Sequence, residues 1–205
     1  AYALKKFVEY IKCFPDVWIA RRIDIAKFWK KNHPPKKQPI IPYDLNRQQF
    51  LSIFGNVFEN SMWIAERAFD FEVGPCMNTA KGLHAALRFQ FRNANRKEKM
   101  QVILEHPDLA GKLAQTKKLT SESTAEQKSA GLDSLTYEEL QKFEVLNNDY
   151  QRKFQHPFIM AVTGLTKDKI LANFKLRISN TPEQEFETAC YEIERIAMLR
   201  IEEIM

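Results

Sequence analysis

The chain has 205 residues, 44% hydrophobic and 28% charged, a composition typical of one folded domain with a short appendage. It contains no run of 18 apolar residues and no recognisable signal peptide, so we expect no membrane span and a cytoplasmic location. Residues 1–42 hold ten Lys/Arg and three Asp/Glu, whereas the remainder is nearly neutral. A nucleic-acid-binding domain would carry its basic excess on the folded body, so we expect no nucleic-acid partner.

Cysteine and histidine spacing argues against a metal site. The three cysteines lie far apart without a Cys-x-x-Cys pair, and the four histidines never fall at metal-ligand spacing on one helix. We therefore expect no metal, no disulfide framework and a reducing compartment.

The N-terminal segment reads as a small appendage. Residues 2–13 have a helical pattern, VWIA at 17–20 predicts a short strand, and residues 21–31 predict an amphipathic helix. Residues 31–43 contain four of the nine prolines, which indicates a semi-rigid linker. About forty residues of this kind cannot bury a core alone, and the first residue, Ala1, suggests a fragment or a processed chain.

After the linker, nearly every segment has apolar residues at three- and four-residue spacing, which predicts helices. Two starts are marked by capping boxes, Thr136 with Glu139 and Thr181 with Gln184. The expected helices cover residues 46–54, 59–69, 78–94, 97–105, 136–154, 166–178 and 181 to the end. We predict an all-α fold, a single irregular bundle of about seven to nine helices over residues 43–205.

His106 is the first candidate for chemistry. It ends the predicted helix VILEH and is followed by Pro107. A helix C-terminus favours charged histidine, and histidine exchanges protons near neutral pH. The alternative is a residue that only stabilises the helix dipole.

Ser123 and Glu126 form a second candidate. Their spacing matches a capping box, which predicts a helix start. The free N–H groups of such a helix terminus also suit an anion, either a side chain or a carboxylate substrate.

Arg200 is the third candidate, because it falls on the apolar stripe of the last helix. A guanidinium turned toward a core needs an anionic partner, either a distant carboxylate or a bound anion. The alternative is that the side chain extends to solvent at the helix end. No Gly-rich phosphate loop, nucleophile elbow or HExxH motif occurs.

These candidates belong to longer strings that resemble a known family. From Tyr43 to the C-terminus, the chain is similar to 2-oxo-4-hydroxy-4-carboxy-5-ureidoimidazoline (OHCU) decarboxylases. The segments that carry the resemblance are FGNVFENSMWIAERAF at 54–69, HPDLAGKLA at 106–114, LTSESTAEQKSAGLDSLT at 119–136, LNNDYQRKFQHPFIMAV at 146–162 and IERIAMLRIEEI at 193–204.

The resemblance implies an all-helical, cofactor-free, usually dimeric enzyme that removes CO2 from OHCU and forms (S)-allantoin in urate degradation. It implies that His106 donates the proton and that Glu126 orients His106 or the substrate. Backbone N–H groups near Phe158 and the Arg200 guanidinium would hold the substrate's oxygens. The implied substrate contacts are Pro107, Ser123, Thr124, Ala125, Glu126, Gln127, Phe158, Ile159, Met160, Ala161, Val162 and Arg200. The alternative is an inactive helical adaptor derived from this family.

Two features lie outside that pattern. Asn60 stands where bacterial relatives often have His, which would alter substrate affinity or pH profile. VWIARRIDIAKFWKKNHP resembles the closing strand and helix of polysaccharide-deacetylase-like allantoinases, which are sometimes fused ahead of this decarboxylase. Residues 1–38 are therefore expected to be a remnant of an upstream domain plus linker.

Overall fold

The computed structural model describes residues 2–18, 20–32, 39–71, 74–110 and 119–205. The chain divides into two compact units, Ala1–Pro39 and Ile40–Met205, which are considered separately.

The first unit contains two helices, α1 (Tyr2–Ile11) and α2 (Arg22–Asn32). Neither helix buries a residue, and aromatic side chains such as Trp18 and Trp29 are more than half exposed. The strand predicted at 17–20 is wrong for the described residues 17, 18 and 20, since a lone strand has no neighbour to pair its backbone groups. Residues 33–38 of the predicted linker lie outside the described part of the chain.

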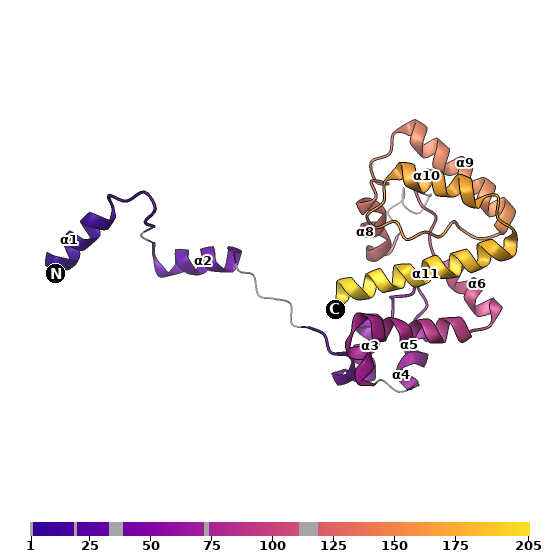
Figure 1. Cartoon of the computed structure of the whole chain (residues 1–205), viewed down its shortest axis with the longest axis horizontal. Helices are drawn as coiled ribbons and strands as arrows, with labels where there is room; N and C mark the ends of the chain where they lie inside the picture. The colour runs from indigo at the N-terminus through magenta and orange to yellow at the C-terminus, as the bar shows by residue number, and fades with distance from the viewer. Residues whose placement is uncertain (1, 19, 33–38, 72–73, 111–118) are drawn as a thin grey trace. The chain divides into compact units, whose positions relative to one another are not determined.

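In the described residues of the second unit, all regular secondary structure is helical and no strand occurs, so the all-α prediction is confirmed (Figure 1). The eight α-helices found in these residues fall within the predicted number. Two short 3-10 helices, η1 (Pro42–Asp44) and η2 (Pro75–Asn78), accompany them. The α-helices are α3 (Arg47–Phe54), α4 (Trp63–Asp70), α5 (Ala80–Asn93), α6 (Arg96–Glu105), α8 (Ser121–Ser129), α9 (Tyr137–Phe154), α10 (Lys167–Arg177) and α11 (Pro182–Ile204).

The capping boxes predicted at the starts of α9 and α11 are confirmed. Two other predicted starts are wrong. The helix expected from residue 59 begins at Trp63, after a run of turns, and the cap of α8 is Thr120, so Ser123 lies inside the helix. Thr120 Oγ1 accepts from the Ser123 N–H at 3.2 Å, so this threonine, three residues earlier, is the capping residue.

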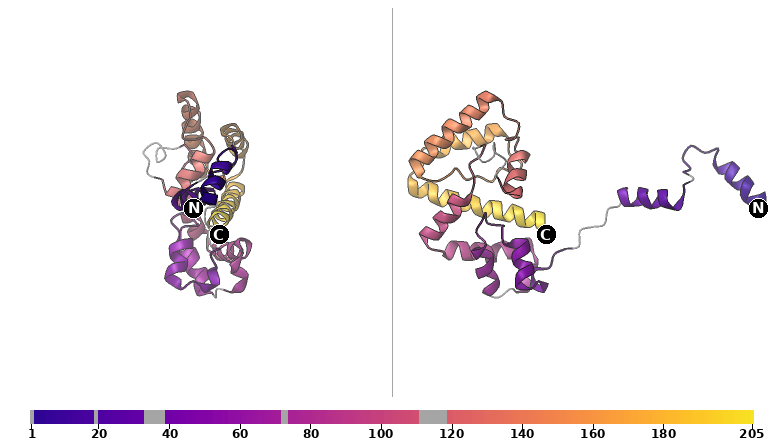
Figure 2. Two further views of the ribbon diagram at one scale, coloured as in Figure 1. Left: turned by 90° about the vertical axis from the view of Figure 1, so that its left-hand side faces the viewer. Right: turned by 180° about the vertical axis from the view of Figure 1, so that it is seen from behind.

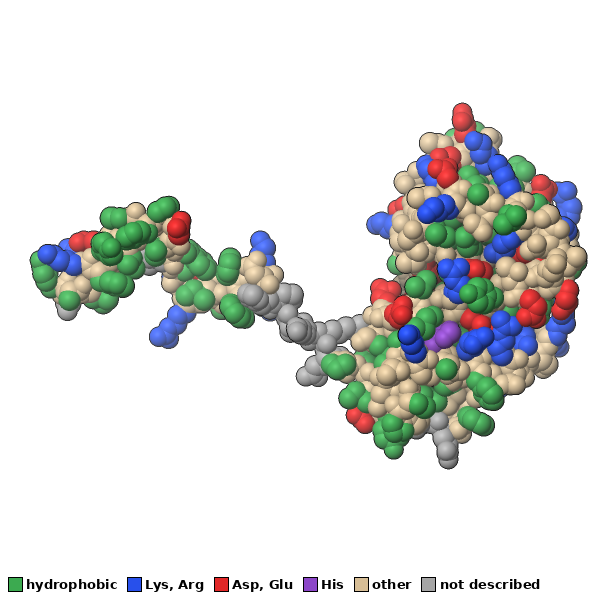
Figure 3. Space-filling view, in the orientation of Figure 1, with side chains coloured by type: hydrophobic (Ala, Val, Ile, Leu, Met, Phe, Trp, Pro, Cys, Tyr) green, Lys and Arg blue, Asp and Glu red, His purple; other side chains and the backbone are tan. Residues whose placement is uncertain are grey.

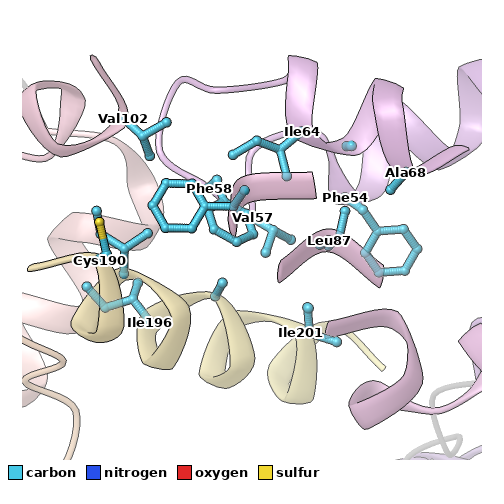
Figure 4. Packing of buried hydrophobic residues seen from close by; sticks show 14 of the residues in the cluster. Phe54, Val57, Phe58, Ile64, Ala68, Leu87, Val102, Cys190, Ile196 and Ile201 are labelled. Atoms are coloured by element: carbon cyan, nitrogen blue, oxygen red, sulfur yellow. The ribbon is translucent and has the colours of Figure 1, made fainter. Parts of the chain in front are cut away.

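Helix α11 runs through the middle of this unit, with α9 and α10 on one side and α3, α4 and α5 on the other (Figures 1 and 2). The two sides have separate hydrophobic cores. In Figure 4, Ile196 and Ile201 of α11 lie against the hydrophobic core that contains Phe54, Phe58 and Leu87. One apolar face of α11 therefore completes the core that it shares with α3, α4 and α5. The rest of the helix can carry polar side chains between the two cores.

The surface carries mixed charge. Figure 3 shows basic and acidic side chains intermingled on the visible face of this unit, as its nearly neutral composition predicts. Among the described residues, no helix has the length and apolar character needed to cross a bilayer.

Candidate active site

A cavity of about 30 Å³ lies where the two sides of the second unit meet at α11. Its walls come from the end of α6 and the following loop, from α8, from α11 and from the irregular segment 158–162. The lining residues are His106, Pro107, Leu109, Ser123, Glu126, Gln127, Phe158, Ile159, Met160, Val162 and Ile196. The structure thus brings segments far apart in the sequence around one small cavity, in which a few polar side chains lie among apolar ones.

His106 is the C-cap residue of α6, and its ring is buried. Nδ1 lies 2.8 Å from the carbonyl oxygen of Val102. A carbonyl can only accept, so Nδ1 carries the hydrogen, and in the neutral ring Nε2 has a free lone pair. Among the described residues, buried Nε2 has no hydrogen-bond partner. This nitrogen is therefore available to accept a proton from a bound molecule.

The electrostatic setting of His106 differs from the sequence-based expectation. Burial lowers the pKa of His106 from 6.5 to about 4, and the hydrogen bond to Val102 and the negative charge of Glu59 only partly oppose it. The expected preference of this histidine for its charged form is wrong, because removing the imidazolium from water costs more than the end of a helix provides.

The loop after His106 is fixed by amide side chains. Gln127 Oε1 accepts from the Ala110 N–H at 2.9 Å, and Asn147 Nδ2 donates to the Leu109 carbonyl at 2.9 Å. Ala110 has a φ of 52°, a conformation that residues with a side chain adopt only when the surroundings hold it. Both amides therefore hold the loop that leads away from His106.

Glu126 and Arg200 meet as a bidentate ion pair. Arg200 Nε lies 2.6 Å from Glu126 Oε1, and Nη2 lies 3.0 Å from Oε2. Arg200 is 4% exposed, so the alternative in which it extends to solvent is wrong, and the partner is a distant carboxylate. Its guanidinium contacts Ser123 and Glu126, which line the cavity, but does not itself line it. Arg200 thus fixes the orientation of the Glu126 carboxylate beside the cavity.

A second carboxylate, Glu59, completes this cluster and was missed by sequence analysis. It is 1% exposed, lies 2.7 Å from Arg200 Nη2, and accepts hydrogen bonds from Thr120 and Ser123 at 2.6 and 3.0 Å. Burial alone would raise the pKa of Glu59, but the charge of Arg200 and the hydrogen bonds from Thr120 and Arg200 hold it below its ordinary value. The spacing pattern had placed Glu59 in a helix, whereas a turn directs it inward.

The remaining predicted contacts divide into two groups. Pro107, Gln127, Phe158, Ile159, Met160 and Val162 line the cavity with His106, Ser123 and Glu126. Thr124 and Ala125 are exposed on α8, and Ala161 is buried without lining the cavity. The Ala161 N–H donates to Glu192 Oε2 at 2.9 Å, so it is occupied within the protein. Asn60 is exposed, with its side chain outside the cluster.

The described residues contain no group of three or more His, Cys, Asp or Glu side chains placed to hold a metal ion. The chemistry that the cavity offers is instead a neutral histidine with a free nitrogen beside an ion-paired carboxylate and a serine hydroxyl. Such groups in a small cavity are typical of a helical protein that has an acid–base site for a small molecule.

Comparison with known proteins gives the family. The OHCU decarboxylase family profile matches residues 43–202. The OHCU decarboxylase of Haloferax volcanii is 35% identical over 159 residues, covering 78% of this chain and 90% of that protein. The chain therefore belongs to the OHCU decarboxylase family.

Other relatives differ in length. A uric acid degradation bifunctional protein from Bacillus sp. strain TB-90 is 37% identical over 161 residues, which are 78% of this chain but only 31% of that protein. Among solved structures, an (S)-allantoin synthase aligns with a TM-score of 0.63 and 27% identity, over 80% of this chain and 52% of the other. An OHCU decarboxylase crystallised in the presence of (S)-allantoin aligns with a TM-score of 0.57 and 25% identity, over 72% and 94%.

Proposed function

We propose that this chain decarboxylates OHCU to (S)-allantoin in urate degradation. The observation that carries the proposal is the free Nε2 of neutral His106 at a cavity shared with Ser123 and Glu126, in a chain of this family.

The substrate's chemistry fits a neutral histidine. Its name places a hydroxyl and a carboxylate on the same carbon, C4. When the C4–CO2 bond breaks, the electron pair moves into the adjacent ring C=N bond, and the ring nitrogen takes up a proton. The resulting enol then loses its hydroxyl proton as the C4 carbonyl forms, and the neighbouring carbon gains one.

We assign this last proton transfer to His106. Nε2 accepts the hydroxyl proton, which becomes possible because burial keeps the ring neutral, and then delivers a proton to one face of the neighbouring carbon. Glu126 and Ser123 face the same cavity and orient the substrate, while Arg200 fixes Glu126 from behind. Delivery from one fixed position explains why a single enantiomer would form.

The test is stereochemical. Freshly generated OHCU is mixed with the protein, and circular dichroism follows the appearance of allantoin. We expect faster consumption and an optically active product, since uncatalysed protonation of a planar intermediate has no preferred face. An unchanged rate with a racemic product would support the alternative of an inactive helical adaptor.

We further propose that residues 1–38 belong to a separate upstream domain and its linker, and that the decarboxylase domain is a homodimer that needs no cofactor. Support for the first point is that α1 and α2 bury no residue.

Deleting residues 1–38 should leave decarboxylation unchanged, and light scattering should give the mass of a dimer. A folded but inactive truncation would show that the segment completes the site.

A further inference from the structure

The segment Phe158–Val162 forms one wall of the cavity although it belongs to no helix or strand. All five residues are buried. Buried backbone groups outside regular structure need partners from elsewhere in the protein, and a wall built this way keeps its shape only if those partners are fixed. Two of its backbone groups, the Ala161 N–H and the Ile159 carbonyl, pair with charged side chains of α11 and α10, whereas the Val162 carbonyl accepts from the Leu165 N–H.

The first partner is Glu192. Its Oε2 accepts the Ala161 N–H at 2.9 Å, and its side chain is about nine-tenths buried. Arg195, one turn later on α11, donates from Nη1 to both carboxylate oxygens at 2.9 and 3.1 Å. The Arg195 side chain is 48% exposed, so it balances the charge while the carboxylate reaches inward.

The second partner is Arg177. Its Nη1 donates to the Ile159 carbonyl at 2.7 Å, and its remaining nitrogens are held by the fully buried Glu185. Glu185 lies seven residues before Glu192 on α11, close to two helical turns, so both acids lie on nearly the same side of that helix. Two points of the wall, residues 159 and 161, are thereby tied to one rigid helix.

We propose that Glu192 is a positioning residue for the reaction: by holding the Ala161 N–H, it fixes the cavity wall formed by Ile159, Met160 and Val162 at the distance that the substrate requires. The inference rests on the proposed function, and it assigns to Glu192 a role in substrate affinity without contact with the substrate. The hydrogen-bond acceptor matters, and the charge does not.

The experiment compares three variants. Glu192→Met keeps the size of the side chain but removes the acceptor, Glu192→Gln keeps an acceptor oxygen, and Arg195→Ala removes the ion pair while leaving the carboxylate. For Glu192→Met we expect KM for OHCU to rise about tenfold with a much smaller change in kcat, the size expected when one hydrogen bond to a charged group is lost. Glu192→Gln and Arg195→Ala should keep KM within about threefold of wild type, because the bond to Ala161 remains.

Hydrogen exchange at the Ala161 amide provides a readout that does not depend on turnover. It should accelerate in Glu192→Met and stay protected in Glu192→Gln. If Glu192→Met fails to fold, Glu192→Ala replaces it, since Ala is a strong helix former.

Unchanged KM and unchanged exchange in a folded Glu192→Met would overturn the proposal, as would equal damage in the Met and Gln variants. Should the wild type itself fail to consume OHCU, the proposed function fails, while the exchange comparison still decides whether Glu192 holds the wall.

Discussion

Two buried Arg–Glu clusters lie along α11, and they differ in charge balance. In the cavity cluster, Arg200 pairs with two carboxylates, Glu59 and Glu126. In the second cluster, Arg177 pairs with one carboxylate, Glu185, which also accepts hydrogen bonds from Tyr150 and Asn180. Among these side chains, the first cluster carries an excess negative charge and the second is neutral.

The cluster with the unbalanced charge is the one that lies at the cavity. In the second cluster, the opposite charge of Arg177 and the neutral donors Tyr150 and Asn180 offset the free-energy cost of burying the Glu185 carboxylate. This cluster therefore stabilises the fold. An extra carboxylate near His106 has another consequence, because the charge of Glu59 favours the imidazolium that burial opposes. We infer that Glu59 lowers the cost of briefly protonating His106, while the charge of Arg200 offsets part of this effect. The second cluster fixes the cavity wall through the Ile159 carbonyl.

Among the variants at the cavity and at the second cluster, His106→Gln should cause the largest loss of turnover. The position ends a helix, so the variant should fold, yet turnover should fall by about two to four orders of magnitude, the usual contribution of an acid–base group. Steady-state kinetics with OHCU and a far-UV circular dichroism spectrum check this. Turnover close to wild type in a folded variant would remove His106 from the mechanism.

Breaking the cavity cluster should have the next largest effect. Arg200→Lys keeps the positive charge but loses the planar guanidinium that holds Glu126. Glu126→Gln removes the negative charge of the carboxylate that Arg200 orients. Each should lower kcat/KM by about 10- to 100-fold, the scale of a misplaced catalytic group, in a folded protein. If both variants keep at least half of wild-type activity, the cavity cluster serves structure alone.

Tyr150→Phe tests the second cluster, where stability should change and activity should not, because the bond from Arg177 to the Ile159 carbonyl of the cavity wall remains. The hydroxyl donates to Glu185, and burial, then the hydrogen bond and charge of Glu185, raise the pKa of Tyr150 well above its ordinary value. Its loss leaves a buried carboxylate with one donor fewer, at a cost of about 1–3 kcal/mol in the free energy of unfolding. Denaturant melts measure this, with Tyr137→Phe at an exposed position as control. A large fall in kcat without loss of stability would contradict the division of roles.

The pH dependence of stability should report His106 as well. Its folded-state pKa of about 4 lies below the unfolded value of 6.5, so between these pH values the unfolded chain binds a proton that the folded protein does not. The free energy of unfolding should therefore fall as pH drops from about 6.5 toward 4. His106→Gln should show a shallower decline over this range, and equal slopes in the two proteins would contradict a neutral buried ring.

The smallest expected effect concerns metals. Dialysis of the full chain against a strong chelator should leave the rate of OHCU consumption unchanged, because the proton transfer is assigned to His106 and the carboxylate beside it is held by Arg200. Enzyme assays before and after dialysis, with and without added divalent ions, provide the measurement. Activity that disappears with chelator and returns with one particular ion would show that a metal takes part.

The helical class and much of the helix pattern could be predicted from local signals along the chain. The capping boxes of α9 and α11 and the apolar stripe of α11 depend on residues three or four positions apart, so they can be predicted from neighbours along the chain. The same stripe showed that Arg200 would need an anionic partner. The start of α8 was predicted wrongly because two residues that can cap a helix, Thr120 and Ser123, lie three positions apart.

Which polar groups meet, and in which charge state, depends on contacts between segments far apart in the sequence. Glu126 lies 74 residues from Arg200 and Glu59 lies 64 residues from Ser123, distances at which spacing carries no information. The neutral state of His106 likewise depends on burial, because desolvation by residues from several helices outweighs the charge preference of its own helix end. A pairing or a pKa set by packing is a property of the folded neighbourhood, and no local pattern encodes it.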